Sequence, residues 1–122
     1  MKGEVILDEK KKNRLMKKEI KELKNITQEV DEDKKPYVDR LIKQAAFMNV
    51  TLEELQETIN TDGATELFEQ GAQKMLREHP AIKSYNTMIK NYTSIIKTLS
   101  EITPSGEGED DEFMTYLAKK NK

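Results

Sequence analysis

Several residue types that support catalysis are missing or scarce. Cysteine is absent, and histidine occurs once, at His79. Without cysteine the chain has no disulfide, no thiol nucleophile and no cysteine-bound zinc, and one histidine leaves almost nothing for a catalytic triad or a transition-metal site. The five glycines do not form the G-x-x-x-x-G-K-[ST] loop that binds nucleotide phosphates. We therefore expect a protein that is not an enzyme and that needs no cofactor and no metal.

Long apolar stretches are also missing. Hydrophobic residues make up 35% of the chain and charged residues 36%, and there is no tryptophan. No apolar run approaches the roughly 18 residues that span a bilayer, so we expect a soluble intracellular protein with no membrane contact. A core is possible but small, which indicates that partner subunits supply part of the burial.

The longest regular pattern is a series of apolar residues between Pro80 and Pro104. Steps of 3 and 4 residues separate them, the a/d spacing of a helix packed along its length against other helices, as in a coiled coil. Proline suits the first turn of a helix, and the residue before a proline avoids helical geometry, so we expect a helix over residues 80–103. The pattern allows a core helix of a small bundle or an assembly helix that packs against copies of itself. The predicted oligomer interface consists of Ile82, Tyr85, Met88, Ile89, Tyr92, Ile95, Ile96, Leu99 and Ile102.

Positive charge is concentrated near the start of the chain. Residues 10–24 hold eight basic residues against two acidic ones. We expect a helix here, capped by Asp8 and ending at about Lys24 or Ile26. Its charges suit either a solvated helix face or contact with the phosphates of DNA or RNA. The candidate DNA-binding residues are Lys10, Lys11, Lys12, Arg14, Lys17, Lys18, Lys21 and Lys24, helped by Lys34, Lys35, Arg40 and Lys43 from the following segment.

Two further helices are expected before residue 63. One begins near Pro36 and closes at residue 50, and the other begins with a capping box at residues 51–54 and ends before Gly63. Two short helices that meet at residues 48–51 would form a corner of the helix-turn-helix kind. The helix after this corner carries three glutamates and no lysine or arginine. We therefore expect the basic first helix to supply most phosphate contacts.

The remaining segments leave alternatives open. Residues 65–78 suit one side of a helix, or a β-hairpin that turns at residues 70–72 between arms at 66–70 and 73–77. Residues 103–112 indicate an acidic linker, because proline, glycine and acids bury too little surface to order themselves. The apolar cluster that follows is either a docking peptide for another protein or a segment that folds back onto its own domain. Its residues are Phe113, Met114, Tyr116 and Leu117.

One family resemblance can be drawn from these motifs. Residues 63–81, with the sequence GATELFEQGAQKMLREHPA, resemble the small terminase subunits of tailed bacteriophages and of prophages of Gram-positive bacteria. The similarity continues through Tyr85-Asn86 and Lys90-Asn91-Tyr92 to the end of the long helix. Its most specific part is His79-Pro80-Ala81 together with that helix and the closing proline. It extends over roughly residues 35–117.

The resemblance implies a non-catalytic protein that binds double-stranded viral DNA at the packaging initiation site. The protein would present this DNA to the large terminase subunit, which carries the ATPase and the nuclease. The resemblance also implies a homo-oligomeric ring, a helix-turn-helix region near the N-terminus and an extended or hairpin-like segment at residues 66–77. A C-terminal segment, here Phe113, Met114, Tyr116 and Leu117, would contact the large subunit. All of this would take place in the cytoplasm of the bacterial host.

We therefore predict a mainly α fold with N-terminal helices that form a helix-turn-helix-like corner, a short extended or hairpin segment, and one long oligomerisation helix. The predicted regions are a DNA-binding region at 1–63, an oligomerisation region at 64–103, and an acidic linker with a partner-docking tail at 104–122. The alternative function is a non-catalytic structural or adaptor protein of a virion or host complex. In that case the basic helix would bind an acidic protein partner.

Overall fold

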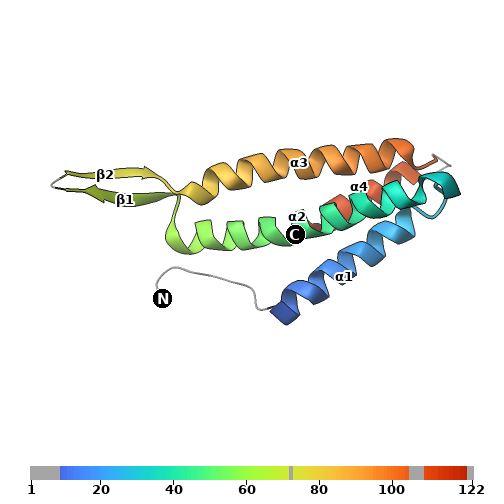
Figure 1. Ribbon diagram of the computed structural model, residues 1–122, viewed down its shortest axis with the longest axis horizontal. Coiled ribbons are helices and arrows are strands. Elements are labelled where there is room, and N and C mark those ends of the chain that lie inside the picture. The colour runs from blue at the N-terminus through green and yellow to red at the C-terminus, as the bar shows by residue number, and fades with distance from the viewer. Residues whose placement is uncertain (1–8, 72, 105–108, 121–122) are drawn as a thin grey trace.

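The protein is mainly helical in the computed structural model, which describes residues 9–71, 73–104 and 109–120. The elements follow one another as α1 (Glu9–Ile26), the 3-10 turn η1 (Glu32–Lys34), α2 (Lys35–Asp62), β1 (Thr65–Gln70), β2 (Gln73–Glu78), α3 (Pro80–Ile102) and α4 (Glu109–Lys120). Successive helices run in opposite directions, and the long α2–α3 pair extends past α1 and α4 to carry the β-hairpin at its far end (Figure 1). The prediction of a mainly α fold with one long helix is confirmed.

One hydrophobic core joins all four helices. Its largest fully buried side chains are Leu23 of α1, Ile42 of α2 and Leu99 of α3. Phe113 and Tyr116 of α4 belong to the same cluster. Burying a leucine, isoleucine or phenylalanine side chain stabilises a fold by about 1.5–3 kcal/mol. The core therefore draws on all three of the predicted regions.

The ends of α1 and α3 lie close to the predicted positions. The Thr27 hydroxyl donates to the Leu23 carbonyl at 2.8 Å where α1 ends, while the predicted cap Asp8 lies outside the described residues. At the start of α3, the Ala81 amide donates to Nδ1 of His79 at 3.1 Å, so the single histidine is the N-cap of the long helix. At its other end the Thr103 hydroxyl donates to the Leu99 carbonyl at 2.6 Å, just before Pro104. The long helix predicted from its apolar spacing is confirmed.

The helix-turn-helix-like corner at residues 48–51 is wrong, because α2 runs without interruption from Lys35 to Asp62. The Thr51 hydroxyl donates to the Phe47 carbonyl at 2.9 Å, one turn earlier in the same helix, and does not cap a new one. No glycine or proline lies between Pro36 and Gly63 to break the helix. Burial of Val50 and Leu52 on either side of Thr51 holds this stretch in register with the core.

Of the two alternatives for residues 65–78, the hairpin is the one observed. Strand β1 pairs antiparallel with β2, and the register places Leu67 opposite Leu76 and Glu69 opposite Lys74. Gly71 has φ of 62°, a conformation that favours glycine and suits the tight turn. Where the hairpin meets the helices, the His79 amide donates to the Ala64 carbonyl at 2.8 Å.

The acidic linker is shorter than predicted. Residues 109–112, predicted to lie in the linker, form the first turn of α4 instead. Acidic residues suit this place because the N-terminus of a helix carries partial positive charge. The other linker residues, 105–108, lie outside the described part of the chain.

Candidate nucleic-acid interface

The exposed face of α1 carries a row of positive charges, called here the basic stripe. Because an α-helix has 3.6 residues per turn, steps of 3 and 4 residues keep side chains on one face. Five cations follow steps of 4, 3, 4 and 3 residues, all of them are exposed, and the opposite face holds the buried Leu23. At a rise of about 1.5 Å per residue the stripe is about 21 Å long. Its residues are Lys10, Arg14, Lys17, Lys21 and Lys24.

The other cations of α1 have different positions. Lys11 and Lys18 are exposed beside the stripe. Lys12 turns inward, and its Nζ lies 3.0 Å from Oε2 of Glu54 on α2. Both side chains of this ion pair are only 23% exposed. Lys12 therefore fastens α1 to α2, while the stripe faces solvent.

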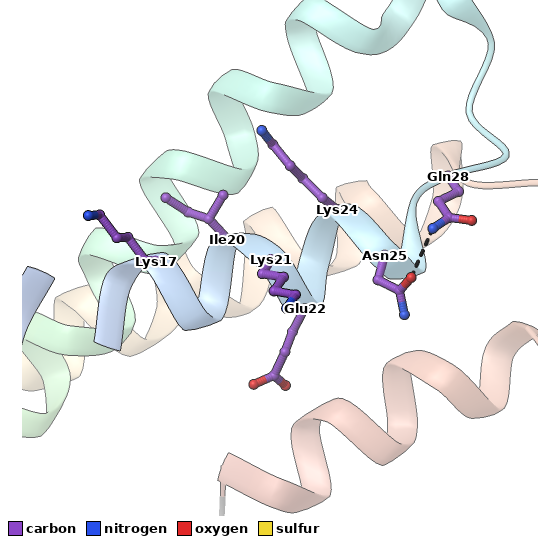
Figure 2. A pocket seen from close by; sticks show the side chains of 7 residues that line it. All are labelled: Lys17, Ile20, Lys21, Glu22, Lys24, Asn25 and Gln28. Atoms are coloured by element: carbon purple, nitrogen blue, oxygen red, sulfur yellow. Dashed lines mark hydrogen bonds between the residues drawn. The ribbon is translucent and has the colours of Figure 1, made fainter. Parts of the chain in front are cut away.

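The surface is hollowed along the C-terminal half of α1. An open groove of about 750 Å³ is lined by three lysines of the stripe and by Ile20, Glu22, Asn25 and Gln28 (Figure 2). The Gln28 amide donates to Oδ1 of Asn25 at 2.8 Å. Glu22, the one acid in the lining, extends toward α4. The groove is thus lined by residues of both kinds, lysines and amide side chains, that contact phosphate oxygens in protein–DNA complexes.

The predicted cations beyond α1 are divided between ion pairing and solvent. Nζ of Lys35 lies 3.6 Å from Oε1 of Glu32 and forms an ion pair with it. Lys34, Arg40 and Lys43 are exposed, the last two on the first half of α2. The second half of α2 has no lysine or arginine. The cations of α2 therefore all lie in its first half.

A buried hydrogen-bond network, which was not predicted from the sequence, connects α4 to α1 and α3. The Tyr92 hydroxyl donates to the Tyr116 hydroxyl oxygen at 3.3 Å, and the Tyr116 hydroxyl donates to Oε2 of Glu19. Glu19 is 2% exposed. A signal was present, because Glu19 lies three residues after Met16 and four before Leu23, on the apolar side of α1. A carboxylate in such a position needs a hydrogen-bonded partner from another element.

Burial determines the protonation state of the two tyrosines in this network. Loss of hydration raises the pKa of Tyr92 above its ordinary value, and the negative charge of Glu22 adds to the rise. Burial is also the main cause that raises the pKa of Tyr116, and the negative charge of Glu22 adds to the rise. Both phenols therefore remain protonated at neutral pH and keep a proton to donate.

The structure places much of the predicted oligomer interface in the chain's own core. Tyr92, Ile96 and Leu99 are buried there. The remaining members keep part of their surface exposed, and all of them except Ile82 pack against the core cluster. These half-buried residues are Ile82, Tyr85, Met88, Ile89, Ile95 and Ile102.

The predicted docking segment is divided in the same way. Phe113 and Tyr116 are buried, so α4 folds back onto its own domain, one of the two alternatives that the sequence left open. Leu117 is half-buried against the core, and Met114 is 66% exposed. Of the four residues, Met114 presents the most surface to a partner.

Two further properties of the described residues bear on chemistry. They include no group of three or more histidine, cysteine, aspartate or glutamate side chains that could hold a metal ion. Nε2 of His79 lies 3.0 Å from Oδ2 of Asp62, and its Nδ1 accepts the helix-capping bond. The histidine thus joins the ends of α2 and α3. Among the described residues, no helix is both long enough and apolar enough to span a bilayer.

Comparison with known proteins adds no relative to this picture. No protein-family model matches the sequence, no curated protein matches it, and no solved structure matches the fold.

Proposed function

We propose that this chain is a terminase small subunit of a tailed bacteriophage or prophage. In this role it binds double-stranded viral DNA at the packaging initiation site and presents it to the large terminase subunit in the cytoplasm of the host bacterium. It acts as a homo-oligomeric ring and performs no catalysis itself. The resemblance of residues 63–81 and of the long helix supports the family, and the basic stripe supports DNA binding.

The basic stripe is the observation that carries the proposal. An α-helix with its side chains is about 10–12 Å wide, and the major groove of B-DNA is about 12 Å wide, so α1 can approach a duplex along its exposed face. Along a duplex, phosphate charges recur about every 1.7 Å of axis, so a stripe about 21 Å long meets several of them. Five cations lie on this face, with Glu9 and Glu22 as the acids beside them, so the face keeps an excess of positive charge that attracts a polyanion.

The DNA-binding role is tested by the salt dependence of affinity. We expect the affinity for duplex DNA to fall steeply as salt rises, because each neutralised phosphate releases counterions. Changing Lys17, Lys21 and Lys24 to glutamine should reduce the slope of log K against log salt by about 2.7, at about 0.9 per phosphate contact. Fluorescence anisotropy with labelled duplexes between low and moderate salt measures this slope.

A matched control exists on α3. Lys83, Lys90 and Lys97 are also exposed and recur every seven residues, so their change to glutamine removes the same charge from another face. We expect this triple variant to keep the wild-type slope. Equal slopes for the two triple variants would move the DNA surface away from α1. Absence of binding at low salt would refute the DNA-binding role and favour an adaptor whose α1 binds an acidic protein.

The oligomeric ring is tested independently by mass. The α2–α3 pair extends past α1 and α4 (Figure 1), and half-buried apolar residues such as Tyr85 and Ile89 lie along α3. Covering such surfaces in a neighbouring subunit stabilises an assembly. Light scattering coupled to chromatography should give a multiple of the 14.1 kDa chain mass. A clean monomer at tens of micromolar would refute the ring.

A further inference from the structure

The β-hairpin leaves an apolar pair uncovered. Leu67 and Leu76 lie opposite each other in the register, and they are 57% and 71% exposed. Among the described residues, each strand makes its main packing contact with the other strand and not with a helix. A two-stranded hairpin alone is marginally stable in water and gains stability from a further strand or from packing. Within one chain, the apolar pair of Leu67 and Leu76 therefore remains largely exposed to solvent.

Both strands of the hairpin are edge strands, and their charges differ. Each edge offers a row of backbone amide and carbonyl groups to another strand. Strand β1 carries Glu66 and Glu69 and no cation, whereas β2 carries Lys74 and Arg77 with a single acid, Glu78. The hairpin therefore has an acidic edge and a basic edge.

The hairpin itself shows how these edges match. Nζ of Lys74 lies 3.5 Å from Oε1 of Glu69, and the two side chains are 68% and 56% exposed. Opposite charges on directly opposed residues stabilise a strand pair, whereas like charges destabilise it. Pairing β2 with a β1 strand is therefore favoured, while pairing two β1 strands would bring acids together.

We propose that β2 of one copy pairs with β1 of a second copy, so that hairpins of neighbouring subunits form one continuous antiparallel sheet. This inference rests on the oligomeric part of the proposed function and names its contact surface. When all hairpins point the same way around an axis, β2 of one copy and β1 of the next run antiparallel, as β1 and β2 do within a chain. Such a head-to-tail contact is heterologous and closes into a ring when the rotation allows. In the same register it also places Leu76 of one copy beside Leu67 of the next, so that the two side chains shield part of each other's apolar surface.

The leucine pair is tested in the full-length chain by changing Leu67 and Leu76 to threonine, which suits strands. We expect this double variant to dissociate at protein concentrations at least tenfold higher than the wild type, because the joined apolar surface is lost. Met114→Gln, at a residue of similar exposure on α4, should leave the dissociation unchanged. Light scattering over a dilution series measures the dissociation. An unchanged helical circular dichroism spectrum shows that the helices of each variant are intact.

The direction of pairing is tested by charge reversal. Glu69→Lys and Lys74→Glu each break the ion pair within the hairpin and also place like charges across the proposed contact. Each variant alone should dissociate at about fivefold higher concentration than the wild type. An equimolar mixture of the two should assemble at a lower concentration than either variant alone, because opposite charges meet again across the contact between copies, although the pair within each hairpin stays broken. A role confined to the hairpin of a single chain would not be rescued by mixing.

These outcomes separate the inference from the proposed function. A wild-type oligomer that the leucine double variant leaves unchanged would overturn the hairpin contact and leave the ring intact. Single charge variants that assemble normally, or that mixing fails to rescue, would also overturn the contact. A monomeric wild-type chain would overturn both the contact and the ring. DNA binding by the basic stripe is measured separately and can fail without affecting either result.

Discussion

Removing the Tyr116 hydroxyl tests what holds α4 on the bundle. The change Tyr116→Phe keeps the ring in the core but deletes the donor to Glu19, a carboxylate that is 2% exposed. A hydrogen bond to a charged group contributes about 1.5–3 kcal/mol, and a bond between neutral groups about 0.5–1.5 kcal/mol. Tyr116→Phe loses both bonds of the network, so we expect it to lower the free energy of unfolding by about 2–4.5 kcal/mol, whereas Tyr92→Phe loses one and should lower it by about 0.5–1.5 kcal/mol.

The two tyrosines should also be energetically coupled. Because Tyr92 donates to Tyr116, the Tyr116→Phe variant already deprives the Tyr92 hydroxyl of its acceptor. The double variant should therefore cost less than the sum of the single variants, with a coupling of about 0.5–1.5 kcal/mol. This is a property of groups in one hydrogen-bond network, and distant sites would give simple additivity.

The measurement is urea unfolding followed by helical circular dichroism at neutral pH. Tyr37→Phe serves as a control, because Tyr37 is 52% exposed and its change should alter the free energy of unfolding by less than about 0.5 kcal/mol. A loss of unfolding free energy for Tyr116→Phe no larger than for Tyr92→Phe, or additive losses in the double variant, would refute this network.

Three other predictions concern the same bundle. Thr51→Ala should raise the free energy of unfolding by about 0.5 kcal/mol, because alanine is more favourable than threonine inside a helix. Urea unfolding measures this change. A decrease of about 1 kcal/mol in the free energy of unfolding would instead identify Thr51 as a helix cap. The pKa of Tyr116 is higher in the folded protein than in the unfolded chain, where it is about 10. The unfolded chain therefore loses this proton first, and the free energy of unfolding decreases as the pH rises above about 10. The stability difference between wild type and Tyr116→Phe should then narrow by up to about 1.4 kcal/mol per pH unit above pH 10 in urea titrations, and a constant difference would contradict this. Glu54→Gln breaks the half-buried pair with Lys12 and should cost about 0.5–1 kcal/mol, whereas exposed Glu53→Gln should be neutral in the same assay.

Local patterns were sufficient for some elements of this fold and misleading for others. The helix from Pro80 and the hairpin around Gly71 follow from chain chemistry, since proline, glycine and apolar spacing restrict the backbone locally. The capping-box sequence at Thr51 obeys the same rules but is overridden, because packing of α2 along its whole length keeps the helix continuous. Similarly, residues 109–112 read as a linker by composition, yet the burial of Phe113 and Tyr116 brings them into the first turn of α4.

The candidate site shows the same division. The cluster of cations in residues 10–24 is visible in the sequence, but which of them face solvent depends on how α1 packs. Lys12 and Lys17 are the same residue type in the same basic run, yet Lys12 forms an ion pair with Glu54 whereas Lys17 is exposed to solvent. Glu19, an acid inside the basic run, is taken into the core by Tyr116.

By itself, the sequence determines a mainly helical chain with a basic first helix. It also determines the boundaries of the long helix that begins at Pro80 and the position of the hairpin turn at Gly71. It contains no cysteine and a single histidine. These properties depend on residue type and on spacing along the chain, which act over one or two helical turns. Only the tertiary structure decides that α2 is one helix, that α4 closes the core, and that five cations share a solvent-exposed face. Those outcomes depend on contacts between residues far apart in the chain, such as Glu19 with Tyr116, and local spacing carries no information about which distant surface a residue meets.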